Sequence, residues 1–336
     1  AAYSRGYRGF ESHPLRHSQG SGRRAAAQAG RPAPDADLTD VILPFPGSEA
    51  QAQALAAALG AEIAVLETRR FPDGESYVRI GSDVSGRRVL AVCSLAGPDE
   101  QFLPLVFAAG VARELGAARV DLVAPYLAYM RQDARFRPGE AVTSRHFAKL
   151  VSREFDGLVT VDPHLHRHAS LDEIYAIPAV AARAAPLLAA WIAAIVERPL
   201  IVGPDSESEQ WAAEVAALAG APHVVLEKSR HGDRDVSIEV PDLGAWRDRQ
   251  PVLIDDIVSS GQTVIEAAAG IVRQRLAPPV CLAVHALFDA EVGRRLARAT
   301  RAVVSTDTVP HPSNGIAVVT LLADAVRSLA PRAPIS

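Results

Sequence analysis

The sequence predicts an α/β protein with two similar domains, each a mostly parallel β-sheet flanked by helices. Three observations support this fold class. Apolar runs of strand length alternate with segments of helical periodicity over most of the chain. The alternation restarts near Leu200 and repeats a similar series of elements. The 336 residues suit about two domains of ordinary size.

Residues 1–37 lie outside this pattern and are expected to be a disordered leader. Gly, Ser, Arg, Ala and Pro dominate them, and apolar periodicity is missing. The arginines and the shortage of acids before Asp35 suggest a transit peptide. However, GYRGFESHPLRH resembles a reading frame that runs through an upstream transfer-RNA gene. We therefore favour a mis-assigned start.

The first domain is expected over residues 38–165. Apolar runs predict strands at residues 41–43, 62–67, 77–80, 88–94, 119–123 and 158–161. Helical patterns lie between them at residues 48–59, 99–115 and 142–153. A Pro-Asp-Gly turn at Gly74 precedes the alternating residues 77–80, which predicts an antiparallel strand there.

The second domain is expected over residues 166–330. Its predicted helices are residues 180–196, 211–219, 264–274, 291–299 and 320–329. Its predicted strands are residues 200–202, 224–227, 236–240, 252–254, 280–287 and 302–305, with a mobile turn at residues 231–234.

The composition excludes some classes of function. The formal net charge of −4 gives no reason to expect nucleic acid as a partner, so any phosphate binding must be local. The longest apolar segment, residues 184–196, is too short to cross a bilayer, and no membrane association is expected. Cys93 and Cys281 lie inside apolar runs, which is typical of buried, reduced thiols in a cytoplasmic protein.

The stretch VLIDDIVSSGQT at residues 252–263 has the features of a site for a phosphorylated sugar. A buried strand leads to two carboxylates, Asp255 and Asp256, and then to a loop of small residues that opens a helix. Backbone N–H groups at such a helix start favour a phosphate. The paired acids would repel that phosphate unless they hold sugar hydroxyls or a metal. The alternative is an ordinary strand-to-helix turn with an Asp cap.

Two other loops carry polar residues directly after predicted strands. Arg131, Arg135 and Arg137 follow one strand, where α/β proteins commonly bind anions, although a solvated surface loop has the same composition. Asp162, His164, His166 and His168 follow the next strand. Alternating histidines lack the paired spacing of a closed zinc site. One imidazole near a hard cation or a phosphate is the better interpretation.

Taken together, these segments resemble the ribose-phosphate pyrophosphokinase family, with phosphoribosyltransferase-type domains, over about residues 40–329. Five motifs agree in order, namely FPDGE at 71–75, RQD at 131–133, VDPH at 161–164, Lys-x-Arg at 228–230 and DDIVSSGQT at 255–263. The resemblance implies an N-terminal ATP-side domain and a C-terminal ribose-5-phosphate-binding domain. It also implies a homo-oligomer built on dimers, in which a neighbouring subunit completes the ATP site.

The resemblance implies a role for each matching residue. ATP would contact Phe71, Asp73, Glu75, Arg131, Gln132 and Asp133. Ribose 5-phosphate would contact Asp255, Asp256, Ser259, Ser260, Gly261, Gln262 and Thr263. The cofactor Mg²⁺ would involve His164 and Asp205, and the catalytic residues of a mobile loop would be Lys228 and Arg230. The implied reaction transfers the pyrophosphoryl group of ATP to the 1-hydroxyl of ribose 5-phosphate, giving phosphoribosyl pyrophosphate and AMP.

The sequence departs from the family pattern in two places. Ser206, Glu207 and Ser208 follow Asp205 where glycines and small residues are usual. Ser259 and Ser260 stand where many members have Asp and Thr. Two alternatives therefore stay open: a phosphoribosyltransferase that consumes the activated sugar, and a catalytically silent regulatory subunit of the synthetase. The complete set of Lys228, Arg230, His164 and Asp205 argues against a silent subunit.

Overall fold

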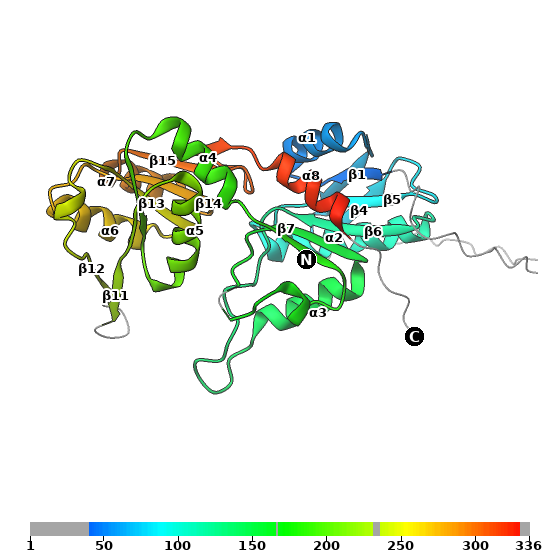
Figure 1. Cartoon of the computed structure of the whole chain (residues 1–336). Helices are drawn as coiled ribbons and strands as arrows, with labels where there is room; N and C mark the ends of the chain where they lie inside the picture. Colours follow the sequence, from blue (N-terminus) through cyan, green and yellow to red (C-terminus); the bar gives the residue numbers. More distant parts are fainter. Residues whose placement is uncertain (1–39, 166, 231–235, 330–336) are drawn as a thin grey trace, which may run out of the picture. The chain divides into compact units, whose positions relative to one another are not determined.

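The computed structural model describes residues 40–165, 167–230 and 236–329 (Figure 1). The expected disorder of residues 1–37 and the expected mobile turn at residues 231–234 lie outside these ranges. Within them, strands and helices alternate along the chain, and the chain forms two six-stranded sheets. The predicted α/β fold class is confirmed.

The first sheet has the strand order β2-β1-β5-β6-β7-β8, and all its pairs are parallel. Its strands are β1 (Asp40–Pro44), β2 (Glu62–Ile63), β5 (Arg88–Val92), β6 (Arg119–Ala124), β7 (Gly157–Val161) and β8 (Ala179–Ala182). The helices between them are α1 (Glu49–Leu59), α2 (Pro98–Glu114) and α3 (Thr143–Glu154). The central strands are buried throughout, as is typical of parallel sheets covered on both faces.

A separate antiparallel ribbon interrupts the first domain. It consists of β3 (Leu66–Arg70) and β4 (Ser76–Ile80), joined by the turn that holds the FPDGE motif. The predicted antiparallel strand at residues 77–80 is confirmed. β4 packs on α2, so the ribbon is attached to the domain by one of its two faces.

The second sheet is also parallel, with the order β10-β9-β13-β14-β15-β16. Its strands are β9 (Pro199–Gly203), β10 (His223–Val225), β13 (Gln250–Val258), β14 (Val280–Ala286), β15 (Ala302–Thr306) and β16 (Asn314–Ile316). Its helices are α4 (Ala185–Ile195), α5 (Glu209–Ala219), α6 (Gln262–Arg273) and α7 (Ala290–Ala299). A second antiparallel ribbon pairs β11 (Glu227–Arg230) with β12 (Val236–Glu239). Short 3₁₀ turns are η1 (Leu171–Glu173), η2 (Ser206–Ser208) and η3 (Gly244–Trp246).

The expected helix at residues 180–196 is wrong in its first part. Ala179–Ala182 form strand β8, which pairs with β7, and α4 starts only at Ala185 with Pro186 in its first turn. Small apolar residues suit either structure, and the free edge of β7 selects the strand. The boundary expected at residues 165/166 also differs from the sheets, because β8 belongs to the first sheet and β9 to the second.

The last helix, α8 (Val319–Ser328), packs against α1, β7 and β8 of the first sheet, as Figure 1 shows for α1 and α8. Its buried side chains Leu322 and Val326 join an apolar cluster that also includes residues of α1, α4 and α5. The C-terminal end of the chain therefore completes the first domain. None of the described helices is long and apolar enough to span a membrane.

Candidate functional site

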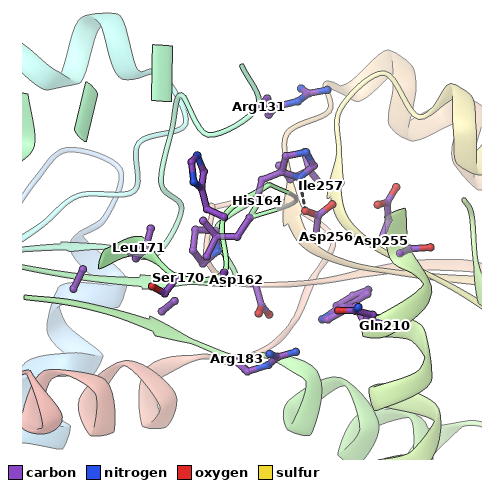
Figure 2. A pocket seen from close by; sticks show the side chains of 18 of the residues that line it. Arg131, Asp162, His164, Ser170, Leu171, Arg183, Gln210, Asp255, Asp256 and Ile257 are labelled. Atoms are coloured by element: carbon purple, nitrogen blue, oxygen red, sulfur yellow. Dashed lines mark hydrogen bonds and ion pairs between the residues drawn. The ribbon is translucent and has the colours of Figure 1, made fainter. Parts of the chain in front are cut away.

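The main candidate site is a hollow of about 710 Å³ beyond the carboxyl ends of β7, β9 and β13. In parallel α/β sheets this edge is where ligands bind. Figure 2 shows Asp162, His164, Asp255 and Asp256 gathered around the hollow, with Arg131 and Arg183 at its edges. Asp205 and Thr263 also line it. The structure thus joins residues from three of the five sequence motifs with Asp205.

The acid pair lies inside strand β13, which continues to Val258 and does not end before Asp255 as expected. Burial raises the pKa of Asp255 well above its ordinary value, and the negative charges of Asp256 and Asp205 raise it further. Asp256 is placed differently, because its Oδ2 lies 2.6 Å from Nδ1 of His164. The two neighbouring carboxyl groups therefore have different environments in one pocket.

The loop after β13 turns into α6 through a glycine. Gly261 has φ +67°, and a Cβ atom there would lie 2.9 Å from Cγ1 of Val292. Only glycine adopts this backbone conformation without strain and leaves that space free. Thr263 faces the hollow, whereas the Gln262 side chain is held by Glu266 and by Nη2 of Arg295. Among the predicted phosphate-loop residues, Ser259, Ser260, Gly261 and Gln262 do not line the hollow itself.

Asp205 caps the short turn η2 and lines the hollow. Its Oδ1 accepts a hydrogen bond from the backbone N–H of Ser208, at 3.3 Å. The Ser208 hydroxyl donates to the Asp205 carbonyl oxygen, at 2.6 Å. The departure from the family pattern after Asp205 therefore has a structural consequence, because Ser208 holds Asp205 in place. In the described part of the chain, three or more His, Cys, Asp or Glu side chains do not gather as a metal site.

The RQD motif contributes only its first residue to the hollow. Arg131 lines the hollow, while Asp133 pairs with Arg167 through Nε and Oδ1 at 3.4 Å. The carbonyl oxygen of Gln132 accepts a hydrogen bond from the N–H of Ser144, which fixes the start of α3.

The FPDGE motif and the Lys-x-Arg motif lie on the two ribbons. Phe71, Asp73 and Glu75 form the turn between β3 and β4, where Oδ1 of Asp73 accepts from the N–H of Glu75 at 3.2 Å. These three residues are not part of the hollow. The backbone of Lys228 and Arg230 lies in β11, opposite Ile238 and Val236 of β12.

Two residues of the site, Arg183 and Trp211, were not singled out from the sequence. Arg183 and Trp211 line the hollow, and Arg183 pairs with Glu214 of α5. Neither residue belongs to a motif, so their position in the fold brings them to the site. Asp162 accepts a hydrogen bond from the N–H of Ala184, and burial raises its pKa to about 6. His168 also lines the hollow, while His166 lies outside the described residues.

His285 of β14 is buried below this site. Its Nε2–H donates to the carbonyl oxygen of Asp162 at 3.3 Å, and its Nδ1 lies 2.9 Å from Oγ1 of Thr308. Burial lowers the pKa of His285 to about 4, so the ring is neutral at physiological pH. It links the second sheet to the backbone of the loop after β7.

Known protein families match most of the part of the chain that the structure describes. Residues 41–154 match the N-terminal domain of ribose phosphate pyrophosphokinase, and residues 170–322 match the phosphoribosyl transferase domain. The ribose-phosphate pyrophosphokinase of Methanopyrus kandleri is 37% identical over 279 residues, which cover 82% of this chain and 94% of that protein. The protein of the same name from Methanothermobacter thermautotrophicus is 33% identical over 291 residues, covering 85% and 100%. In structure, phosphoribosylpyrophosphate synthetase from Mycobacterium smegmatis gives a TM-score of 0.74 at 23% identity, covering 86% and 98%.

Proposed function

Because the chain belongs to the ribose-phosphate pyrophosphokinase family, we propose that it transfers the pyrophosphoryl group of ATP to the 1-hydroxyl of ribose 5-phosphate. The products are phosphoribosyl pyrophosphate and AMP. The family membership and the two phosphoribosyltransferase-type domains agree with the resemblance found in the sequence. The observation that carries the proposal is the single hollow that unites Asp255, Asp256, Thr263, Arg131 and His164.

The sugar phosphate occupies the β13–α6 side of the hollow in this proposal. Asp256, whose Oδ2 lies 2.6 Å from Nδ1 of His164, accepts hydrogen bonds from ribose hydroxyls. The 5-phosphate meets the loop at residues 259–263, where N–H groups at the start of α6 and the Thr263 hydroxyl supply donors. This orientation brings the 1-hydroxyl toward the phosphates of ATP. Positioning of this kind can supply a large share of the rate enhancement.

The carboxylates of the hollow suit a magnesium ion that is held mainly through substrate phosphates, because such an ion needs only one or two protein carboxylates. Asp205 and Asp256 are close enough to Asp255 for their charges to raise its pKa, and carboxylate oxygens are the ligands that this hard cation prefers. His164 and Asp205 would hold the ion, directly or through the phosphates. When bound, Mg²⁺ neutralises phosphate charge and so makes the phosphoryl group easier to attack.

The residues of the chain then act on charge that develops during transfer. The 1-hydroxyl oxygen forms a bond to the β-phosphorus, the bond from that phosphorus to the α,β-bridging oxygen breaks, and AMP leaves. Lys228 and Arg230, on β11, stabilise the negative charge of the phosphoryl oxygens. Arg131, in the loop after the carboxyl end of β6, binds the nucleotide phosphates.

We also propose a homo-oligomer built on dimers and a cytoplasmic location. The hairpin turn with Phe71, Asp73 and Glu75 is not part of the hollow. In a dimer, these residues of one subunit would contact the ATP bound in the hollow of its neighbour. The free, buried thiols of Cys93 and Cys281 suit a reducing compartment.

The test is incubation of the protein with ATP, Mg²⁺ and ribose 5-phosphate, followed by phosphorus NMR. The expected result is equimolar AMP and phosphoribosyl pyrophosphate, and neither product without ribose 5-phosphate. A phosphoribosyltransferase would instead consume phosphoribosyl pyrophosphate when a nucleobase is added, although such an enzyme does not account for the match at residues 41–154. Absence of product with every donor nucleotide would favour the silent regulatory subunit.

A further inference from the structure

The ribbon formed by β3 and β4 has two chemically different faces. Toward the domain, Ile80 is buried, and Leu66 and Val78 pack against the apolar cluster of the first domain. Arg70 donates to the carbonyl oxygens of Gly74 and Glu100, at 3.3 and 3.4 Å, and so ties the turn to α2. The inner face therefore accounts for the attachment of the ribbon.

The outer face carries two cross-strand pairs that include an arginine. Arg79 lies opposite Glu67, with Nη1 and Oε2 3.6 Å apart. Arg69 lies opposite Tyr77, and its guanidinium carbon is 4.2 Å from the centre of the Tyr77 ring. The two arginines share one ribbon and one face, but one has a carboxylate partner and the other an aromatic partner.

Arg69 also stacks on Phe71, the first residue of the turn. Its guanidinium carbon is 4.6 Å from the centre of the Phe71 ring, and the Phe71 and Tyr77 rings meet edge to face at 6.1 Å. We call Arg69, Phe71 and Tyr77 the hairpin cluster. Both ring contacts are within the range of a cation–π interaction, which holds the flat guanidinium group against an aromatic face.

The hairpin cluster leaves part of the Phe71 ring open. The Phe71 side chain is 39% exposed although Arg69 covers one side of it. An exposed phenylalanine without such a neighbour would sample several rotamers, and binding would have to restrict it. Arg69 removes much of this freedom before a ligand arrives. A ring that is already held in place is a better stacking surface for a flat, aromatic ligand.

We propose that Arg69 is a positioning residue for the nucleotide donor: it holds the Phe71 ring, with Tyr77 as support, in the orientation that stacks on the adenine base. This inference rests on the proposed function for the identity of the ligand. Arg69 and Tyr77 lie outside the FPDGE motif, so the motif alone assigns them no role. Arg69 acts through Phe71 and does not itself touch the reacting atoms.

The test compares Arg69→Ala, Arg69→Lys and Phe71→Ala, together with the double variant, in the full-length protein. Binding of the non-transferable analogue α,β-methylene ATP with Mg²⁺ is measured by calorimetry, and steady-state kinetics are measured with both substrates varied. Arg69→Ala is expected to raise the Kd of the analogue and the KM for ATP by roughly threefold to tenfold. The value of kcat and the KM for ribose 5-phosphate should change by less than about twofold. Arg69→Lys should restore part of the loss, because an ammonium group also binds an aromatic face.

Arg79→Ala is the matched control, since it removes an arginine from the same face of the same ribbon and is expected to leave nucleotide binding unchanged. The double variant decides how Arg69 acts. If it acts through Phe71, Arg69→Ala adds little to the loss already caused by Phe71→Ala.

Fully additive losses would overturn the positioning role, and so would an equal effect of Arg79→Ala or a change confined to ribose 5-phosphate. Failure of the wild-type protein to form phosphoribosyl pyrophosphate would count against the proposed function. The analogue-binding comparison would still decide the role of Arg69, and absence of any nucleotide binding would overturn it.

Discussion

Asp255 and Asp256 are adjacent residues of β13, yet their surroundings give the two carboxyl groups different chemistry. Burial and two neighbouring carboxylates raise the pKa of Asp255, which favours its protonated form. Asp256 has the His164 ring 2.6 Å from its Oδ2 atom. In our proposal, Asp256 is the acceptor for the ribose hydroxyls.

Asp256→Asn is expected to weaken ribose 5-phosphate far more than ATP, because it replaces a charged acceptor in the sugar site by a neutral one. Loss of a charge-assisted hydrogen bond costs about 1.5–3 kcal/mol, which corresponds to roughly a tenfold to hundredfold rise in the KM for ribose 5-phosphate. Steady-state kinetics with both substrates varied measure this. Equal losses for the two substrates would contradict the assignment and point to a metal role or to misfolding.

His285 should make stability depend on pH in a defined direction. Its pKa is lowered to about 4 in the folded state, so the unfolded chain takes up a proton first as the pH falls below the ordinary value of 6.5. The stability that the neutral ring provides is complete above that value and is lost on the way down to about 4.

The measurement is urea unfolding of the wild type and of His285→Asn at neutral and acid pH. Between roughly pH 7 and pH 4, the free energy of unfolding of the wild type should fall by about 3 kcal/mol relative to that of His285→Asn. The raised pKa values of Asp162 and Asp255 act in the opposite direction, but they do so in both proteins. A difference that does not change with pH would show that His285 does not resist protonation.

At the scale of elements, the start of α6 depends on one glycine. Gly261→Ala is expected to destabilise the fold by about 1–2 kcal/mol or more, because φ is +67° and the new Cβ meets Val292. It should also raise the KM for ribose 5-phosphate, since the loop must move to relieve the contact. Chemical denaturation and steady-state kinetics report the two effects.

Gly220→Ala is the matched control for this substitution. Gly220 has φ +62° at the end of α5, and nothing lies within 4 Å of an added Cβ. It should show only the cost of the backbone conformation and leave the KM unchanged. If both variants raise the KM for ribose 5-phosphate equally, the close packing of residue 261 against α7 does not determine the position of the loop before α6.

The β11–β12 ribbon is the element on which catalysis depends in our proposal. Lys228→Ala should lower kcat by at least about a hundredfold and leave both KM values nearly unchanged. A group that meets the phosphoryl oxygens mainly in the transition state contributes to rate and little to binding, and one such donor is worth roughly 3 kcal/mol. Lys149→Ala, which removes an exposed lysine from α3, serves as the control. Near-normal turnover of Lys228→Ala would remove β11 from the catalytic machinery.

At the scale of the whole molecule, the C-terminal helix stabilises the N-terminal sheet. Arg88 of β5 donates to the carbonyl oxygen of Val326, and Arg327 donates to that of Ala58 in α1, at 3.4 and 2.6 Å. Leu322 is 1% exposed in the same cluster. The start and the end of the described chain therefore share one core, although more than two hundred residues separate them in sequence.

Leu322→Ala should consequently destabilise the first sheet. Removal of a buried leucine side chain costs about 2–4 kcal/mol, and hydrogen exchange of the amides in β1 and β8 should accelerate. Leu218→Ala on α5, where the side chain is 55% exposed, should change stability by less than about 0.5 kcal/mol. Unchanged exchange in β1 and β8 would mean that α8 is not part of the first folding unit.

The alternation of elements could be predicted because apolar periodicity is local information. Buried strands such as residues 41–43 and 89–92 carry continuous apolar runs, and the amphipathic helices carry the longer period. Strand β8 and strand β16 could not be predicted in the same way. Each contains at most four residues and exists because a neighbouring strand offers unpaired N–H and C=O groups.

The sequence by itself determined the fold class, the family and the chemical type of the candidate site residues, because these are encoded in short motifs and in local periodicity. Only the tertiary structure decided which of those residues meet. It brought Arg131, His164, Asp205 and Asp256 to one hollow, and it left Phe71 on a separate ribbon. It also added Arg183 and Trp211, which belong to no motif. The physical reason is that parallel strands end at the same edge of a sheet, so the order of strands, which depends on long-range pairing, sets which loops of one sheet become neighbours. Contacts between the two sheets' residues, such as Asp256 with His164 and His285 with Asp162, then join the two sets of loops.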